Sequence, residues 1–253
     1  MDPFDQQRLT AALTAAAIDP SRWTEALEIA AACTGSYGAI LLPVVGILPI
    51  VAATPSMDGS SEMYIRDGWD GRDERFLAKA RFLSNGVATD DDCMPFEARQ
   101  RSPFYQEFLR PHNLTEWAGV RIGRGDLVWN LSLQRTPDQG PYSTDELQSL
   151  AELANRLDSV VRTSAALGMA RGEAALDAFD FSARPAFLLD RSGLVVRANE
   201  AAEQLIGEDV QISGGHVRSS DAHASERLNH AIRVLLWSHK ASTVPPIIFP
   251  KTT

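Results

Sequence analysis

Apolar residues near the start of the chain recur every three or four positions, the spacing of one face of a helix. Residues 4–17 therefore predict a first helix. A second helix is expected to follow at once, because Asp19 suits an N-cap and Pro20 suits the first helical position. Two apolar runs at residues 37–42 and 47–54 then predict a pair of strands joined by a turn.

The middle of the chain changes character twice. Residues 55–113 hold only short helical stretches, without a sustained period. Residues 116–122 and 127–134 then read as two strands with the composition of a β-hairpin. Gly123 and Gly125 stand between them and can adopt the positive φ that a tight turn needs. This pattern predicts an antiparallel sheet flanked by helices.

A long helix is expected to lead out of this region. Ser143 and Glu146 form an S-x-x-E capping box, and the helix is predicted over residues 143–167. Its apolar seam could pack back on the sheet or pair with a second copy, and we expect a homodimer. The seam consists of Leu147, Leu150, Ala154, Leu157 and Val161.

The last third of the chain returns to strands. Two short strands with a turn between them are predicted within residues 186–197. Asn199 can N-cap a short helix over residues 200–206, with Gly207 after it. An amphipathic helix follows over residues 222–238, and residues 244–249 predict another strand.

These elements predict two domains of the α/β (α+β) class. Residues 1–165 are expected to form a domain with an antiparallel sheet and flanking helices, from which the long helix exits. Residues 172–253 are expected to form a smaller, partial α+β domain.

The composition of the chain argues against several classes of function and location. With 24 Lys and Arg against 33 Asp and Glu, the net charge is −9 and the pI about 5.1. No basic cluster is present to bind phosphates, so we expect no DNA-binding surface within these residues. Cys33 and Cys93 show no metal or redox spacing, and the acidic N-terminus does not resemble a signal peptide. The apolar run at residues 39–53 is shorter than a membrane helix needs. Because a secreted chain of this size would more often carry several cysteines, we expect a cytoplasmic protein.

Residues 184–202 read RPAFLLDRSGLVVRANEAA: an apolar strand, a D-x-x-G turn, a second strand and then A-N-x-A-A. This pattern resembles the first hairpin and helix of a PAS domain. The Asn199 side chain can hold the corner between strand and helix. The PAS-like segment offers few groups that could hold a haem or flavin, because it has no Cys and its His residues lie away from the strands that would form a pocket.

Three further segments carry a second resemblance: DPSRW at residues 19–23, GWDGRDER at 68–75 and QGPYSTDE at 139–146. Together they resemble a GAF-like sensor placed ahead of a PAS segment in LuxR-type helix-turn-helix transcriptional regulators. The resemblance implies a small-molecule-sensing region whose ligand signal passes through the long helix to a DNA-binding domain. Since such regulators continue into that domain, we expect this chain to be a fragment of a longer regulator.

Aromatic and charged residues in the irregular middle and on the hairpin are the candidates for ligand binding. Organic ligands need aromatic walls and a few polar groups that fix their orientation. Asp73 can accept a hydrogen bond from a ligand, and Arg75 can bind a carboxylate or carbonyl group. The full set is Tyr64, Trp69, Asp73, Arg75, Phe104, Tyr105, Phe108, Trp117 and Trp129.

Plainer interpretations remain beside this one. Each aromatic residue can simply belong to the core, which makes a protein-interaction or dimerisation module without a ligand the alternative function. We expect no enzyme, no cofactor and no metal site, since the chain has no nucleophile elbow or phosphate-binding loop. The run Asp90-Asp91-Asp92 lacks the ligand spacing of a calcium loop and is expected to be an exposed acidic loop.

Overall fold

The computed structural model describes residues 3–46, 52–190, 193–207, 209–237 and 244–249. The chain divides into two compact units, of which the first ends at Ser164 and the second begins at Ala165. Residues 47–51 of the strand expected over 47–54 lie outside the described part. In the described residues, no helix is both long and apolar enough to cross a bilayer.

A five-stranded antiparallel sheet forms the centre of the first unit, with the strand order β2-β1-β5-β4-β3. The mixed α+β fold expected from the sequence is therefore present. The β4–β5 hairpin turns through Gly123 and Gly125, whose φ values are +90° and +68°. The strands are β1 (Gly38–Val45), β2 (Ala52–Ala53), β3 (Val87–Thr89), β4 (Glu116–Arg124) and β5 (Leu127–Arg135).

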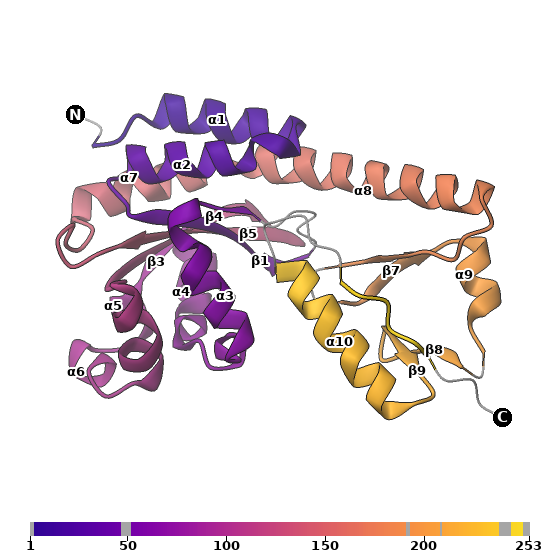
Figure 1. The fold of residues 1–253 in the computed structure, drawn as a ribbon. Coiled ribbons are helices and arrows are strands. Elements are labelled where there is room, and N and C mark those ends of the chain that lie inside the picture. Colours follow the sequence, from indigo (N-terminus) through magenta and orange to yellow (C-terminus); the bar gives the residue numbers. More distant parts are fainter. Residues whose placement is uncertain (1–2, 47–51, 191–192, 208, 238–243, 250–253) are drawn as a thin grey trace. The chain divides into compact units, whose positions relative to one another are not determined.

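The two faces of this sheet carry different residues because side chains alternate along each strand. Trp129, Leu131 and Leu133 of β5 point to one face, which we call the α2 face, since α1, α2 and α7 lie on that side (Figure 1). Ser132 and Gln134 point to the other, the α3 face, over which α3 to α6 lie.

The α2 face is closed by two helices, and the expected start signal at Asp19 and Pro20 lies between them. The helix α1 (Gln6–Ile18) is capped by Asp5, and Asp19 accepts a hydrogen bond from the Ser21 N–H at the start of a short 3-10 turn. The helix α2 (Trp23–Cys33) follows directly. Its Trp23 ring meets the Trp129 ring edge-on, with centroids 6.1 Å apart, and both indoles are buried.

The long helix expected over residues 143–167 is divided into two. The capping box of Ser143 and Glu146 is confirmed, but α7 (Thr144–Ala154) ends with Asn155 as its C-cap, and α8 (Asp158–Phe181) begins three residues after that cap. The prediction of one continuous helix was therefore wrong.

The apolar seam of this segment packs inside the single chain. Leu150, Ala154, Leu157 and Val161 are each at most 2% exposed, and Leu147 is half-buried. This corresponds to the first of the two expected arrangements, since α7 lies against β4. The seam is therefore not available to a second copy, and dimerisation stays a prediction without this surface.

A buried arginine holds α7 to the sheet and to α2. Arg135 of β5 donates hydrogen bonds to Glu146 at 2.7 Å and to the Thr34 carbonyl at 2.6 Å. Its guanidinium also lies 3.8 Å from the centre of the Tyr142 ring. Burial raises the pKa of Tyr142 to about 12, so the phenol stays neutral beside this cation.

Short helices cover the α3 face where the sequence indicated only helical stretches. They include a π-helical turn at residues 104–109, a conformation that is rare and concentrated at functional sites. In chain order they are α3 (Asp58–Arg66), η4 (Glu74–Ala78), α4 (Lys79–Asn85), α5 (Asp90–Cys93), α6 (Phe96–Arg99) and η5 (Phe104–Leu109).

The described residues of the second unit form two hairpins and two helices besides the end of α8. The strand expected over residues 244–249 is wrong, because those residues form no strand in the structure. The PAS-like identity of this unit stays a prediction. Its elements are β6 (Phe187–Leu189), β7 (Val195–Ala198), α9 (Glu200–Leu205), β8 (Val210–Ser213), β9 (His216–Ser219) and α10 (Ala222–Trp237).

The corner before α9 is held as the sequence predicted. The Asn199 side-chain oxygen accepts hydrogen bonds from the Ala202 and Ala186 N–H groups, both at 2.9 Å. The Asn199 amide donates to the Arg184 carbonyl at 2.8 Å. One buried side chain therefore joins the strand β6, the corner and the first turn of the helix.

We expect Asn199→Ala to weaken this corner by about 2 kcal/mol, because it removes an N-cap and two further hydrogen bonds. Hydrogen exchange read by mass spectrometry should show faster exchange in residues 184–205 and unchanged exchange in the first unit. Gln204→Ala, on the exposed side of α9, is the control and should leave the exchange as it was. Equal exchange in both variants would contradict the assigned role of Asn199.

Candidate functional site

Aromatic side chains gather against the α3 face in a cluster built largely from η5. The Phe104 and Phe108 rings stack with centroids 5.5 Å apart, and Phe108 stacks on Trp69 at 5.6 Å. Methionines surround the rings and can adapt their shape. The aromatic cluster comprises Ala53, Met57, Trp69, Phe104, Tyr105, Phe108, Leu109 and Leu114, with the partly buried Ile40, Met63, Tyr64 and Met94.

A second apolar cluster lies farther along the same face. It contains Ala78, Phe82, Ala88, Trp117 and Val128. The guanidinium of Arg75 faces a ring of each cluster, at 5.8 Å from the centre of Phe104 and 5.2 Å from the centre of Trp117. A charged group therefore lies where the two apolar clusters meet.

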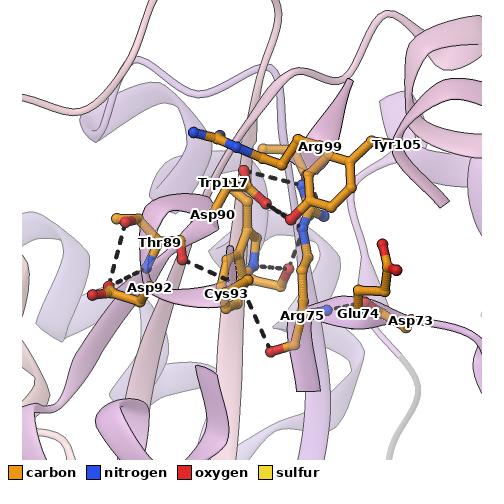
Figure 2. A network of polar contacts seen from close by, with 12 residues as sticks. Asp73, Glu74, Arg75, Thr89, Asp90, Asp92, Cys93, Arg99, Tyr105 and Trp117 are labelled. Carbon is orange, nitrogen blue, oxygen red and sulfur yellow. Dashed lines mark hydrogen bonds and ion pairs between the residues drawn. The ribbon is translucent and has the colours of Figure 1, made fainter. Parts of the chain in front are cut away.

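Arg75 forms a buried ion pair with Asp90 (Figure 2). Its Nε donates to the Asp90 carboxylate at 2.9 Å, and its Nη2 donates to the second carboxylate oxygen at 3.4 Å. The two side chains are only 9% and 2% exposed. The Tyr105 hydroxyl donates to the same carboxylate at 2.8 Å, and Arg75 also donates to Gln134 at 3.1 Å.

The sheet extends this network on its α3 face. Gln134 donates to the Ser132 hydroxyl at 3.0 Å, and the Trp117 indole N–H donates to that hydroxyl at 2.9 Å. These groups share one face because Trp117 is the cross-strand partner of Gln134. A chain of hydrogen bonds thus runs from Asp90 through Arg75 into β5 and β4.

The ionisation of this network is set by burial and by the ion pair. Burial acts most strongly and would lower the pKa of Arg75, but Asp90, Tyr105 and Asp73 together outweigh it and the pKa is raised. Burial, reinforced by Asp90, also raises the pKa of Tyr105. The guanidinium is therefore charged and the phenol neutral at physiological pH.

Asp73 and Glu74, which precede Arg75, anchor two further segments. Asp73 accepts hydrogen bonds from the Arg75 backbone N–H at 2.8 Å and from the Tyr64 hydroxyl of α3 at 2.9 Å. Glu74 accepts a hydrogen bond from Ser102, just before η5. Three consecutive residues therefore connect α3, η5, α5 and the sheet.

Burial raises the pKa of Asp73, and the Asp90 carboxylate adds to this. Arg75 and the two hydrogen bonds that Asp73 accepts act in the opposite direction. The pKa of Tyr64 is raised by its burial and by Asp73. Strongly shifted groups of this kind concentrate at functional sites.

The structure brings together most of the ligand-binding residues expected from the sequence. Trp69, Phe104, Tyr105 and Phe108 share the aromatic cluster, Tyr64 packs against it, and Asp73, Arg75 and Trp117 adjoin it. Trp129 is the exception. It lies on the α2 face against Trp23 and is separated from the rest by the sheet, because its neighbours Val128 and Asn130 take the opposite side.

Asp90 was expected in an exposed loop, and this is wrong. The residue is 1% exposed and pairs with Arg75, whereas the Asp91 side chain is 81% exposed. Asp92 accepts a hydrogen bond from the Thr89 N–H as part of a capping box, which was the available signal that the acidic run starts a helical turn. Gln134 was also not predicted as a site residue from the sequence. Its position on β5, opposite Trp117, places its side chain beside Arg75.

The site offers hydrogen bonding and stacking, and little reactive chemistry in the described residues. Burial, with the Asp90 carboxylate, raises the pKa of Cys93 to about 12, so its thiol is not a ready nucleophile. In the part of the chain that the structure describes, no group of three or more His, Cys, Asp or Glu side chains is arranged to hold a metal ion. The arrangement can bind an organic molecule through aromatic faces and a few polar groups.

No protein-family model matches the chain, and no curated protein matches it. Among solved structures, the chain is similar to the VqsR LBD domain from Pseudomonas aeruginosa. The two share 15% sequence identity at a TM-score of 0.45, over 62% of this chain and 94% of that chain. We draw no conclusion about function from a likeness at that TM-score.

Removing one partner of the buried ion pair should destabilise the folded protein. We expect Arg75→Met to lower the free energy of unfolding by about 3–5 kcal/mol, because Asp90 is left buried without a cation. The double variant with Asp90→Leu should lose less than the sum of the two single variants, since it leaves no lone charge. Urea unfolding at pH 7 measures the free energy of unfolding of Arg75→Met, of Asp90→Leu and of the double variant.

Arg22→Met is the matched control for this cycle, because the pair of Arg22 with Glu25 lies exposed on the surface. It should have little effect on the midpoint of unfolding. Additive losses in the double variant would show that Arg75 and Asp90 are not energetically coupled.

The raised pKa of Asp73 predicts a pH dependence of stability. The folded protein holds this proton more tightly than the unfolded chain, so the contribution is present at low pH and lost as pH rises through the folded pKa. The free energy of unfolding of the wild type, minus that of Asp73→Asn, should therefore fall as pH is raised from about 4. Urea unfolding at a series of pH values tests this, and a difference that rises with pH would contradict it.

Proposed function

We propose that the first unit is a sensing domain that binds a small organic molecule. The ligand would be held between the α3 face and the layer formed by α3 and η5. The observation that carries the proposal is the buried network of Arg75, Asp90, Tyr105 and Gln134 beside the aromatic cluster. Ligand sites combine such apolar walls with a small number of fixed polar groups.

A structural role alone accounts poorly for this network. Replacing a buried ion pair by well-packed apolar residues often leaves stability unchanged or raises it, so such a pair is weak support for stability. The π-helical turn that supplies Phe104 and Tyr105 and the shifted pKa values of Asp73 and Tyr64 point the same way. All of them occur within one small region of the α3 face.

The finer proposal is that this unit belongs to a LuxR-type transcriptional regulator in the cytoplasm. It is supported by the sequence segments at residues 19–23, 68–75 and 139–146. Ligand binding would be transmitted through α7 and α8, since α7 packs on β4 and α8 leads toward the PAS-like segment. A DNA-binding domain would receive the signal, and the protein would act as a regulator and not as an enzyme.

A protein-interaction module is the second candidate function. Three large apolar side chains, Phe76, Leu77 and Phe96, are each more than 60% exposed on the short helices of the α3 side. Exposed apolar residues can mark an interaction surface. This function predicts that replacing the three by Ser abolishes binding of the partner protein. It also predicts that partner binding does not depend on any small molecule.

Thermal unfolding of the whole chain with a panel of small organic metabolites tests the sensing proposal. We expect at least one compound to raise Tm, because a ligand at 100 times its Kd stabilises the folded state by about 2.7 kcal/mol. Tyr105→Phe keeps the ring but removes the hydroxyl on Asp90, and it should weaken the response.

Tyr37→Phe is the matched control, because Tyr37 is partly exposed and lies outside the aromatic cluster. It should respond to the same compound as the wild type does. A panel of diverse charge and size in which no compound shifts Tm would contradict the sensing proposal.

A further inference from the structure

Acidic groups outnumber basic ones in the buried part of the site. Asp90 is buried and Asp73 is partly buried, while Arg75 is the cation that lies near both and is paired with Asp90. The side chain of Arg75 is taken up by Asp90 and Gln134. In the described residues, the Asp73 carboxylate instead receives two neutral donors, the Arg75 backbone N–H and the Tyr64 hydroxyl.

This second carboxylate lies at the end of the aromatic cluster. The Tyr64 ring packs on Phe108 with centroids 5.5 Å apart, and Phe108 stacks on Trp69. The faces of aromatic rings attract cations through their quadrupole. One face of Trp69 already does so, because the Arg72 guanidinium lies 4.0 Å from its centre.

We infer that the ligand is an organic amine whose protonated nitrogen binds Asp73 in place of the Tyr64 hydroxyl, with its apolar or aromatic body among the rings of the aromatic cluster. This inference rests on the proposed function and narrows the class of ligand. It goes beyond the sequence analysis, which assigned Asp73 only a hydrogen bond from the ligand.

Asp73 should bind an ammonium group more strongly than it binds the phenol hydroxyl of Tyr64. A hydrogen bond between two charged groups is shorter and stronger than one with a neutral donor. An ammonium group would also form a direct ion pair with Asp73, whose hydrogen-bond donors in the described residues are both neutral. Tyr64 is half-buried and its ring packs on Phe108, so the amine would have to displace the Tyr64 hydroxyl from Asp73 against this packing.

The surroundings can adapt to a bound body. Met57, Met63 and Met94 pack around the rings, and unbranched thioether side chains fill irregular spaces. A carboxylate ligand would meet the opposite situation. It would meet the carboxylates of Asp73 and Asp90, and the Arg75 guanidinium is already paired with Asp90.

Three compounds with the same ring and different charge test this inference: tyramine, 4-ethylphenol and 4-hydroxyphenylacetate. Isothermal titration calorimetry on the whole chain at pH 7 compares them. We expect tyramine to bind about tenfold or more tightly than 4-ethylphenol, and 4-hydroxyphenylacetate to bind most weakly. Equal or tighter binding of the neutral or the acidic compound overturns the inference, and so does no binding by all three.

Two variants locate the effect at Asp73. Asp73→Asn keeps the shape and can still accept from the Arg75 N–H, so it should remove the preference for tyramine and leave 4-ethylphenol unchanged. Tyr64→Phe removes the hydroxyl that the amine displaces and should strengthen tyramine binding. Glu62→Gln, an exposed acid on α3, is the control and should change neither compound.

The two proposals fail in different ways. An unchanged preference for tyramine in Asp73→Asn overturns the assignment of the amine to Asp73, whatever the metabolite panel shows. If Asp73→Asn does not fold, weaker tyramine binding by Tyr64→Phe overturns the same assignment. A panel hit that is neutral or acidic sustains sensing and overturns the amine.

Discussion

A guanidinium and a carboxylate that leave water together lose their hydration, and they are tolerated only where geometry and further hydrogen bonds compensate for the loss. Arg75 and Asp90 meet this condition on the α3 face. The carboxylate receives the Tyr105 hydroxyl as well as the guanidinium, and the guanidinium reaches Gln134 on the sheet. The positions of η4, α5, η5 and β5 are therefore linked through one pair of charges.

The short helices of this side depend on that link. Helices of four to nine residues have little stability of their own in water, since nucleation costs more than a few hydrogen bonds return. The triplet Asp73-Glu74-Arg75 connects three of these segments to one another and to the sheet. A ligand that replaced one of these contacts would act on several segments together, which is the property that a sensing domain requires.

The two faces of the sheet differ in their side chains and in the helices that cover them. The α2 face carries tryptophan, leucine and alanine against long helices, and its buried Arg135 serves to fix α7. The α3 face carries Ser132, Gln134 and Trp117 against short, irregular segments. Buried polar contacts occur on both faces, and those of the α3 face adjoin the aromatic cluster.

Local signals in the sequence were sufficient for the elements that depend on neighbouring residues. The caps at Asp19, Ser143 and Asn199 were correct, because a cap is a contact between residues two or three positions apart. The glycine-rich hairpin was correct for the same reason. An antiparallel sheet was also expected, from four predicted strands, whereas β3, with three residues, was too short to leave a pattern.

Contacts between distant residues were decided by the tertiary structure alone. Arg75 and Asp90 are joined through the fold, and the alternation that separates Trp129 from Trp117 matters only once the register of β4 and β5 is known. The acidic run at residues 90–92 looks uniform in sequence, yet one member is buried and its neighbour is exposed. The sequence by itself determined which residue types could form a site, whereas packing determined which of them meet, because burial and pairing depend on segments that the chain brings together only when folded.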